Sequence, residues 1–129
     1  MIHRRSVLLS LAALPLLGTV PALAAEPVAF TEDAFKAALD SGKPILVAIH
    51  ASWCPTCKAQ KPILDGLLNG RFSDMVAFRV DFDDQKDVVR QFGAQMQSTL
   101  IVFAKGAEVG RSVGDTNPTS IEALLAKSA

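Results

Sequence analysis

The segment that most constrains the fold is an apolar run that leads directly into two closely spaced cysteines. Residues 44–50 read PILVAIH, a β-branched and apolar stretch of the kind that forms a central strand covered on both faces of a sheet. Cys54 and Cys57 follow, and apolar residues then recur at helical spacing as far as Leu68. We therefore predict a buried strand that leads into a helix, with both thiols at the start of that helix.

The rest of the chain after residue 26 alternates between strand-like and helix-like spacing of apolar residues, with no repeat or low-complexity tract. This alternation predicts an α/β fold in the order β-α-β-α-β-α-β-β-α. Pro62 lies inside the second predicted helix, where it removes a backbone donor and is expected to bend the helix. The predicted strands are residues 27–30, 44–50, 75–82, 99–103 and 108–114, and the predicted helices are a helix capped by Thr31 that runs through Leu39, the cysteine helix to Leu68, and residues 84–93 and 118–127.

Residues 1–25 differ in composition from everything that follows. They contain Arg4 and Arg5 near the start, continue with an apolar run, and end in small residues. This is the pattern of an export signal that is cleaved after Ala24 or Ala25. A membrane anchor needs roughly 18 or more uninterrupted apolar residues, whereas this run contains two prolines and a glycine. The arginine pair is compatible with both the secretory and the twin-arginine route, so export is predicted and the route stays open.

Residues 26–129 are predicted to form a single domain, in keeping with the length of the chain. Half of the residues are hydrophobic, which is enough apolar material for one globular core. Without residues 1–25 the chain carries 11 basic and 13 acidic residues, a formal net charge of −2. No basic stripe interrupts the acids, so we expect no nucleic-acid partner. We also expect a monomer that contacts no membrane once the signal is removed.

The position of the cysteine pair favours redox chemistry over a structural role. A disulfide between Cys54 and Cys57 would close a loop with only two intervening residues and would restrict the unfolded chain very little. At a helix start, however, unpaired N–H groups and the helix dipole favour the thiolate, which is the nucleophilic form. Cys54 is thus the predicted attacking sulfur, and Cys57 is the thiol that resolves the mixed disulfide. Pro55 fits the first helical turn, and Thr56 is either a spacer or a hydroxyl near the sulfurs.

A metal site is the alternative interpretation of the same residues. A closed zinc site needs four ligands, but after export the chain offers only Cys54, Cys57 and His50 as sulfur or imidazole ligands. Thiolates suit copper(I). The alternative hypothesis is therefore a periplasmic copper(I)-binding module that uses both cysteines, with His50 nearby. On the redox interpretation the chain needs no cofactor beyond its own two sulfurs.

The segment WCPTCK, which contains both cysteines, resembles the active-site motif of the thioredoxin superfamily. Pro62 matches the family's kinking proline five residues after the second cysteine, and Gly114 matches its glycine after the last strand. The resemblance covers nearly all of residues 28–129. It implies a thioredoxin-like fold, with a central mixed β-sheet flanked by helices, and thiol–disulfide exchange by the cysteine pair. Trp53 is then expected to pack beside the sulfurs and to shape the surface that binds protein substrates.

The chain departs from the family pattern at the start of the fourth predicted strand. The family has a cis-proline that faces the cysteines, but here the chain reads QSTLIVF, with Ser98 in that place. Because a cis bond before a residue other than proline costs about 2.5–4 kcal/mol, the bond between Gln97 and Ser98 is predicted to be trans. We expect both residues to line the substrate site. If Ser98 faces the sulfurs, its hydroxyl can donate a hydrogen bond to the Cys54 thiolate.

Two further departures lie on the strand side of the cysteines. Thioredoxins proper bury an aspartate six residues before the first cysteine, where this chain has Ala48. Arg79 is the counterpart of the family's facing basic residue, and it either pairs with Asp81 or Asp83 or lies on the surface. His50 stands where an aromatic residue is common, and a lone histidine there is more often packed or exposed than a base or a ligand.

These observations predict an exported thiol–disulfide oxidoreductase that works in the bacterial periplasm with protein substrates and a redox partner protein. The absence of any cysteine outside the pair supports this interpretation, since a stray thiol would risk wrong pairing in an oxidising compartment. The two residues between the cysteines and the nearby charges set thiolate stability. The Pro-Thr pair does not decide whether the protein reduces or oxidises its substrates.

Overall fold

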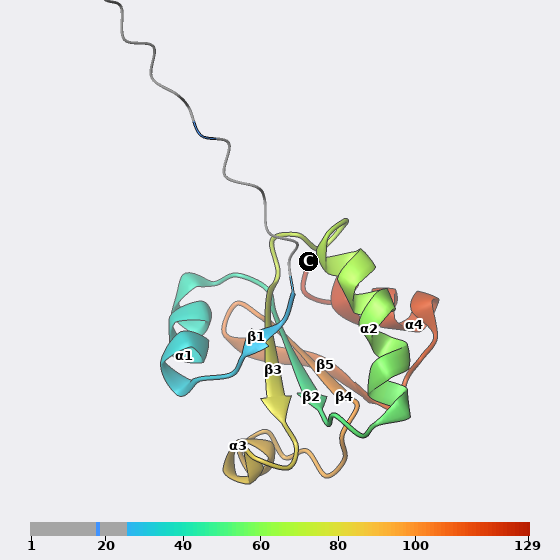
Figure 1. Cartoon of the computed structure of the whole chain (residues 1–129). Coiled ribbons are helices and arrows are strands. Elements are labelled where there is room, and N and C mark those ends of the chain that lie inside the picture. The colour runs from blue at the N-terminus through green and yellow to red at the C-terminus, as the bar shows by residue number, and fades with distance from the viewer. Residues whose placement is uncertain (1–17, 19–25) are drawn as a thin grey trace, which may run out of the picture.

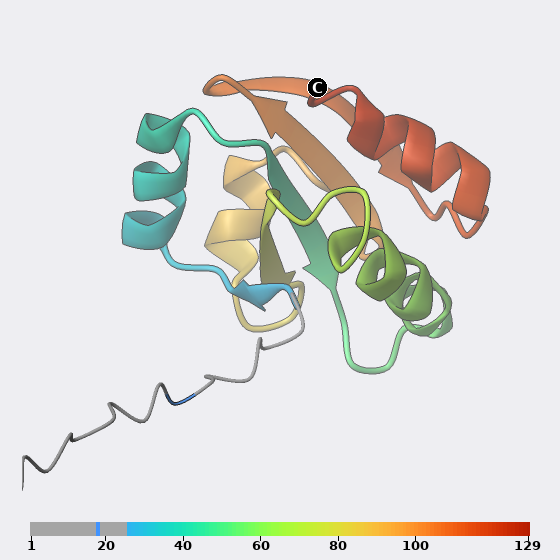
Figure 2. The same cartoon turned by 90° about the horizontal axis from the view of Figure 1, so that it is seen from above.

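A computed structural model of the chain describes Gly18 and residues 26–129, so the predicted export signal otherwise lies outside the described residues. The described part folds into one five-stranded sheet with helices on both faces (Figures 1 and 2). The strands are β1 (Val28–Ala29), β2 (Ile45–His50), β3 (Val76–Asp81), β4 (Thr99–Ala104) and β5 (Ala107–Val113). The helices are α1 (Glu32–Ser41), α2 (Pro55–Leu68), α3 (Lys86–Gln91) and α4 (Pro118–Ala126). This is the predicted element order.

The sheet is mixed, as predicted, and its strand order is β1-β3-β2-β4-β5. Strand β3 runs parallel to both β1 and β2, whereas β4 runs antiparallel to both β2 and β5. The strand that precedes the cysteines, β2, therefore lies in the centre, and Ile45 to Ile49 are all buried. Its carboxyl end is the point from which the chain enters α2.

Side chains of β2 alternate between two hydrophobic cores, one on each face of the sheet. Ile45, Val47 and Ile49 belong to the core that α1 and α3 cover. Leu46 and Ala48 belong to the core that α2 and α4 cover, and Figure 2 shows these two helices together on that face. Because side chains alternate along a strand, the next residue on the α2 face after Ala48 is His50.

Helices α1, α2 and α4 begin where the sequence predicts, and α3 begins two residues later than predicted, at Lys86. The Thr31 hydroxyl accepts a hydrogen bond from the backbone N–H of Ala34, at 3.2 Å, and caps α1. The Asn117 side chain caps α4 in the same way, and Pro118 occupies the first turn, where a missing N–H costs nothing. Pro62 lies inside α2, which runs without interruption from Pro55. None of the helices in the described part of the chain is long and apolar enough to cross a membrane.

Candidate active site

Cys54 occupies the N-cap position of α2, so the helix start falls where the sequence analysis placed it. Its backbone is extended, with φ −87° and ψ 112°, and its Sγ accepts a hydrogen bond from the backbone N–H of Cys57 at 3.0 Å. Pro55 follows as the first helical residue. The Cys54 sulfur thus accepts a hydrogen bond from one of the backbone N–H groups that have no partner within the helix. Such a donor stabilises negative charge on sulfur.

Cys57 lies in the first turn of α2, directly beside Cys54. Both thiols are free, and both residues are almost fully buried, with 1% and 4% of their surfaces exposed. The pKa of the Cys57 thiol is raised to about 11, mainly by burial and also by the hydrogen bond and charge of Cys54, while the backbone groups of Ala51 and Ser98 oppose the shift. Near neutral pH Cys57 is therefore a protonated thiol. The two sulfurs are chemically unequal, as a nucleophile and a resolving thiol must be.

Trp53 is the exposed residue of the site. More than half of its surface, 56%, is accessible, and its indole N–H donates a hydrogen bond to Asp83 Oδ2 at 2.7 Å. This bond joins the cysteine loop to the turn between β3 and α3. Thr56 is half-buried, and no side-chain hydrogen bond of Thr56 is found within residues 26–129, which agrees with the spacer interpretation.

Ser98 reaches the site through its backbone and not through its hydroxyl. No peptide bond in the described part of the chain is cis, so the bond after Gln97 is trans as predicted, and Ser98 adopts φ +61°. In this structure the Ser98 hydroxyl donates its hydrogen bond to the carbonyl of Gln97 and not to the Cys54 sulfur. The backbone N–H donates instead to Ile49 O at 2.7 Å. A proline has no N–H and could not make that bond.

Gln60 is a site residue that the sequence analysis missed. Its amide nitrogen donates to Ser98 O at 3.2 Å and to Asp115 O at 2.8 Å, and the residue is 3% exposed. The Ser98 carbonyl also accepts the N–H of Gly114, at 3.1 Å. The sequence contains a pattern that could have identified it, because Gln60 follows Cys57 by three residues and shares the buried face of α2. A polar residue on that face needs a specific partner.

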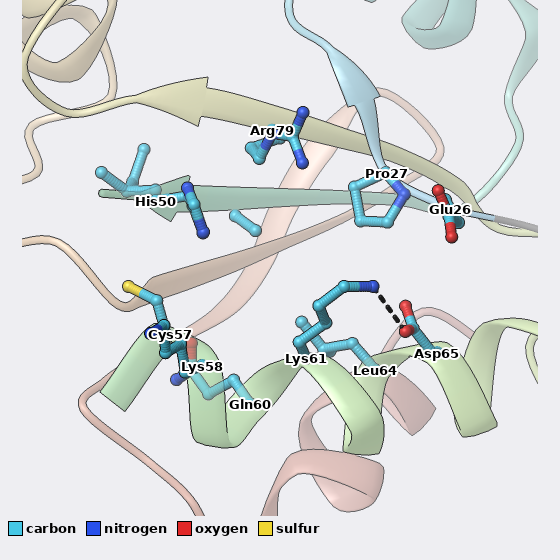
Figure 3. A pocket seen from close by; sticks show the side chains of 12 residues that line it. Glu26, Pro27, His50, Cys57, Lys58, Gln60, Lys61, Leu64, Asp65 and Arg79 are labelled. Carbon is cyan, nitrogen blue, oxygen red and sulfur yellow. Dashed lines mark hydrogen bonds and ion pairs between the residues drawn. The ribbon is translucent and has the colours of Figure 1, made fainter. Parts of the chain in front are cut away.

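A pocket of about 220 Å³ lies between α2 and the ends of β2 and β3, and Cys57 lines one wall (Figure 3). Ala48, His50 and Arg79 line the wall that the strands provide. The small side chain of Ala48 leaves space where a larger residue would fill the wall. The lining residues are Glu26, Pro27, Ala48, Ile49, His50, Cys57, Lys58, Gln60, Lys61, Leu64, Asp65 and Arg79.

Arg79 lies opposite Ala48 in the β2–β3 register and is exposed into this pocket region. The expected partners Asp81 and Asp83 are engaged elsewhere: Asp81 Oδ1 accepts the backbone N–H groups of Asp83 and Asp84, and Asp83 accepts the indole N–H of Trp53. The salt bridges found among the described residues do not include Arg79. Arg79 is thus exposed and forms no ion pair with Asp81 or Asp83 among the described residues, and it also lines the pocket beside Cys57.

For the copper(I) alternative, the site offers the two free sulfurs of Cys54 and Cys57. The described residues contain no group of three or more histidine, cysteine, aspartate or glutamate side chains that could hold a metal ion. His50 therefore does not complete a three-ligand site with Cys54 and Cys57. Thr56 and Trp53 supply no ligand atoms of the soft type that copper(I) prefers.

Taken by its geometry, the site is that of a dithiol–disulfide exchange protein: two buried, unequal thiols at a helix start, next to an exposed aromatic residue. The thioredoxin family model matches residues 26–127. The chain belongs to the thioredoxin family, and it is a thioredoxin-type disulfide oxidoreductase.

Individual relatives agree with this assignment. The chain is similar to the H-type thioredoxin of Fagopyrum esculentum, with 36% identity over 80 residues that cover 62% of this chain and 68% of that protein. It is similar to a thioredoxin of Mycobacterium tuberculosis, with 37% identity over 76 residues, or 59% of this chain and 66% of that protein. The crystal structure of Trxlp from Edwardsiella tarda matches with a TM-score of 0.75 and 40% identity, covering 78% of this chain and 98% of that one.

Proposed function

We propose that the protein is exported to the bacterial periplasm and exchanges disulfides there with partner proteins, as a monomer. Cys54 is the nucleophile and Cys57 the resolving thiol. The observation that carries these roles is the hydrogen bond from the backbone N–H of Cys57 to the sulfur of Cys54, at 3.0 Å. This bond directs a backbone donor at one sulfur, while burial, the largest of several causes, raises the pKa of the other thiol, Cys57, to about 11.

Two exposed apolar side chains support the proposal that the substrate is a protein. Trp53 is 56% exposed and directly precedes Cys54. Met96 is 52% exposed and precedes the Gln97–Ser98 segment. Large apolar groups of this kind, placed beside a reactive centre, are typical of surfaces that bind other proteins. The substrate class is therefore a protein with an accessible disulfide or thiol, and a second redox protein restores the pair after each turnover.

Trapping of the covalent intermediate tests the roles of the cysteines. The full chain with Cys57→Ser should accumulate mixed disulfides with other proteins at Cys54, because the resolving step is lost. The matched variant Cys54→Ser should trap none. Equal trapping by the two variants, or trapping by Cys54→Ser alone, would contradict the assignment.

The proposed location has a separate test. The full chain, expressed in a bacterium that exports proteins, should be recovered from the periplasm in a form that begins at Ala25 or Glu26, as intact mass measures directly. The N-terminal pattern of residues 1–25 supports this expectation. Replacing Arg4 and Arg5 together by lysine distinguishes the two export routes, because the twin-arginine route requires the arginine pair. Full-length protein found only in the cytoplasm would contradict export.

A further inference from the structure

The resolving step poses a chemical problem in this chain. Cys57 must lose its proton before its sulfur can attack the mixed disulfide. Burial is the largest cause that raises the pKa of Cys57 to about 11, and burial persists when the charge on Cys54 is consumed in the mixed disulfide. At the strand position that faces Cys57 across the pocket, this chain has Ala48, which has no group that accepts a proton. The proton needs another acceptor.

The pocket beside Cys57 contains a histidine in a suitable place. His50 ends β2, is half-buried, and lines the same pocket as Cys57. In Figure 3 its imidazole ring points from the strand toward α2, on the side of the pocket where Cys57 lies. A volume of about 220 Å³ has room for several water molecules. A proton can therefore pass from the thiol to the imidazole through water.

The charged groups that face His50 favour its neutral form. Arg79 and Asp81 come from β3, and burial followed by the charge of Arg79 lowers the pKa of His50 below its usual 6.5, against a smaller opposing influence of Asp81. From α2, the pocket is lined by Lys58 and by the ion pair of Lys61 with Asp65, whose atoms are 2.7 Å apart. The imidazole is thus uncharged near neutral pH and free to accept a proton.

The carboxylates of the pocket are less well placed than His50. Glu26 and Asp65 lie at the end of the pocket away from Cys57, as Figure 3 shows. Asp65 is also held by Lys61, at 2.7 Å, and an ion pair of this kind favours the charged carboxylate over the protonated one.

We propose that His50 accepts the proton of Cys57 during the resolving step, through the pocket that both side chains line. The proposal rests on disulfide exchange by the cysteine pair. As the proton leaves Cys57 for the imidazole, the Cys57 sulfur bonds to the Cys54 sulfur, and the bond between Cys54 and the substrate sulfur breaks. The electron pair of that bond departs with the substrate thiolate, so the substrate is reduced and the pair is oxidised. The imidazolium then returns its proton to solvent or to the departing thiolate.

A limiting amount of the aryl disulfide dithiobis(nitrobenzoate) separates the two steps in stopped flow. Attack by Cys54 releases the first coloured thiolate, and attack by Cys57 releases the second. The variant His50→Gln keeps a polar side chain of similar size but takes up no proton. It should leave the first phase unchanged and slow the second near neutral pH by about 10²-fold, the range of general-base catalysis. The control variant Lys36→Met, at an exposed position of α1 on the other face of the sheet, should leave both phases unchanged.

The pH profile of the second phase is a readout that a merely structural role of His50 would not change. In the native chain the rate should fall as pH drops through the His50 pKa, which lies below 6.5. In His50→Gln the rate of the second phase should instead rise with increasing pH, in proportion to the hydroxide concentration, until the pH reaches the pKa of Cys57. Adding Ala48→Asp to His50→Gln should restore at least part of the rate, because it places a new acceptor in the pocket.

Three results would overturn the proposal. One is a second phase of unchanged rate and pH dependence in a folded His50→Gln protein. Another is an equal slowing of both phases, and the third is a second phase that remains hydroxide-dependent after Ala48→Asp is added. Absence of any second phase in the native chain would overturn disulfide exchange itself, and so the two failures are distinguishable.

Discussion

Gln60 donates a hydrogen bond from its buried side-chain amide to the carbonyl oxygen of Ser98, at 3.2 Å. The same nitrogen donates to Asp115 O at 2.8 Å. The helix that holds Cys57 is thereby fixed to the segment that enters β4 and to the loop before α4. This side chain therefore helps to fix the Ser98 backbone next to the helix that holds Cys57, together with the backbone bonds of Ser98 to Ile49 and Gly114.

Loss of the Gln60 amide should destabilise the protein. In Gln60→Met the side chain keeps its length but leaves the Asp115 carbonyl without this donor, which should lower the free energy of unfolding by about 1–3 kcal/mol. Urea denaturation of the reduced protein measures this. The exposed Gln91→Met provides the control, with a change expected within about 0.5 kcal/mol. Similar changes in both variants would show that the amide bonds contribute nothing.

Substitutions at Ser98 should distinguish the contribution of its backbone N–H to stability from the contribution of its hydroxyl. Ser98→Pro loses the N–H that binds Ile49 O and cannot adopt φ +61°, so the free energy of unfolding should fall by at least about 2 kcal/mol. Ser98→Ala loses only the hydroxyl bond, at a cost of about 1 kcal/mol. Ser98→Gly should stay within about 1 kcal/mol of the native chain, since relief of the left-handed conformation offsets that loss. A proline variant as stable as the native chain in thermal unfolding would contradict this account.

The fold was largely predictable from the sequence because its signals are local. The β-branched run of β2, the cap Thr31 and the proline–asparagine start of α4 each act within a few residues. The cysteine positions followed from the same logic, since a helix that begins directly after a buried strand leaves Cys54 at its cap.

The details around the sulfurs depend on contacts between distant segments, and the sequence pattern did not reveal them. The direction of the Ser98 hydroxyl depends on the left-handed backbone conformation of this residue. Serine rarely adopts that conformation, and no nearby sequence pattern predicts it here. The pairing of Asp83 with Trp53 joins residues 30 positions apart. The pocket next to Cys57 arises from the combination of Ala48 with the packing of α2 against the sheet.

Cys57 should remain a poor nucleophile even when Cys54 is absent. Burial is the largest cause of its raised pKa and survives in Cys54→Ala, whereas the hydrogen bond and charge of Cys54 do not. Because only the thiolate reacts, alkylation of Cys57 should be slow near neutral pH and accelerate as pH rises, with a midpoint above 9.0 and below about 11. Iodoacetamide kinetics as a function of pH supply the measurement. A midpoint at or below 9.0 would mean that burial does not control this thiol.

Trp53 is the sole tryptophan of the chain, and so its fluorescence reports on the site directly. Asp83→Ala removes the acceptor of the indole N–H, which should lower the fluorescence anisotropy of Trp53 and cost about 1 kcal/mol of stability or less. The neighbouring Asp84→Ala is the matched control and should leave the anisotropy unchanged. Equal anisotropy in the native chain and Asp83→Ala would show that the bond does not hold the ring.

The central claim is that Cys54 attacks and Cys57 resolves, and competitive alkylation of the reduced native chain tests it most directly. A brief exposure to substoichiometric iodoacetamide near neutral pH, followed by peptide mass mapping, shows which sulfur reacts first. The hydrogen bond to the Cys54 sulfur and the raised pKa of Cys57 predict that the label is found on Cys54. Label found first on Cys57, or equally on both cysteines, would contradict the account.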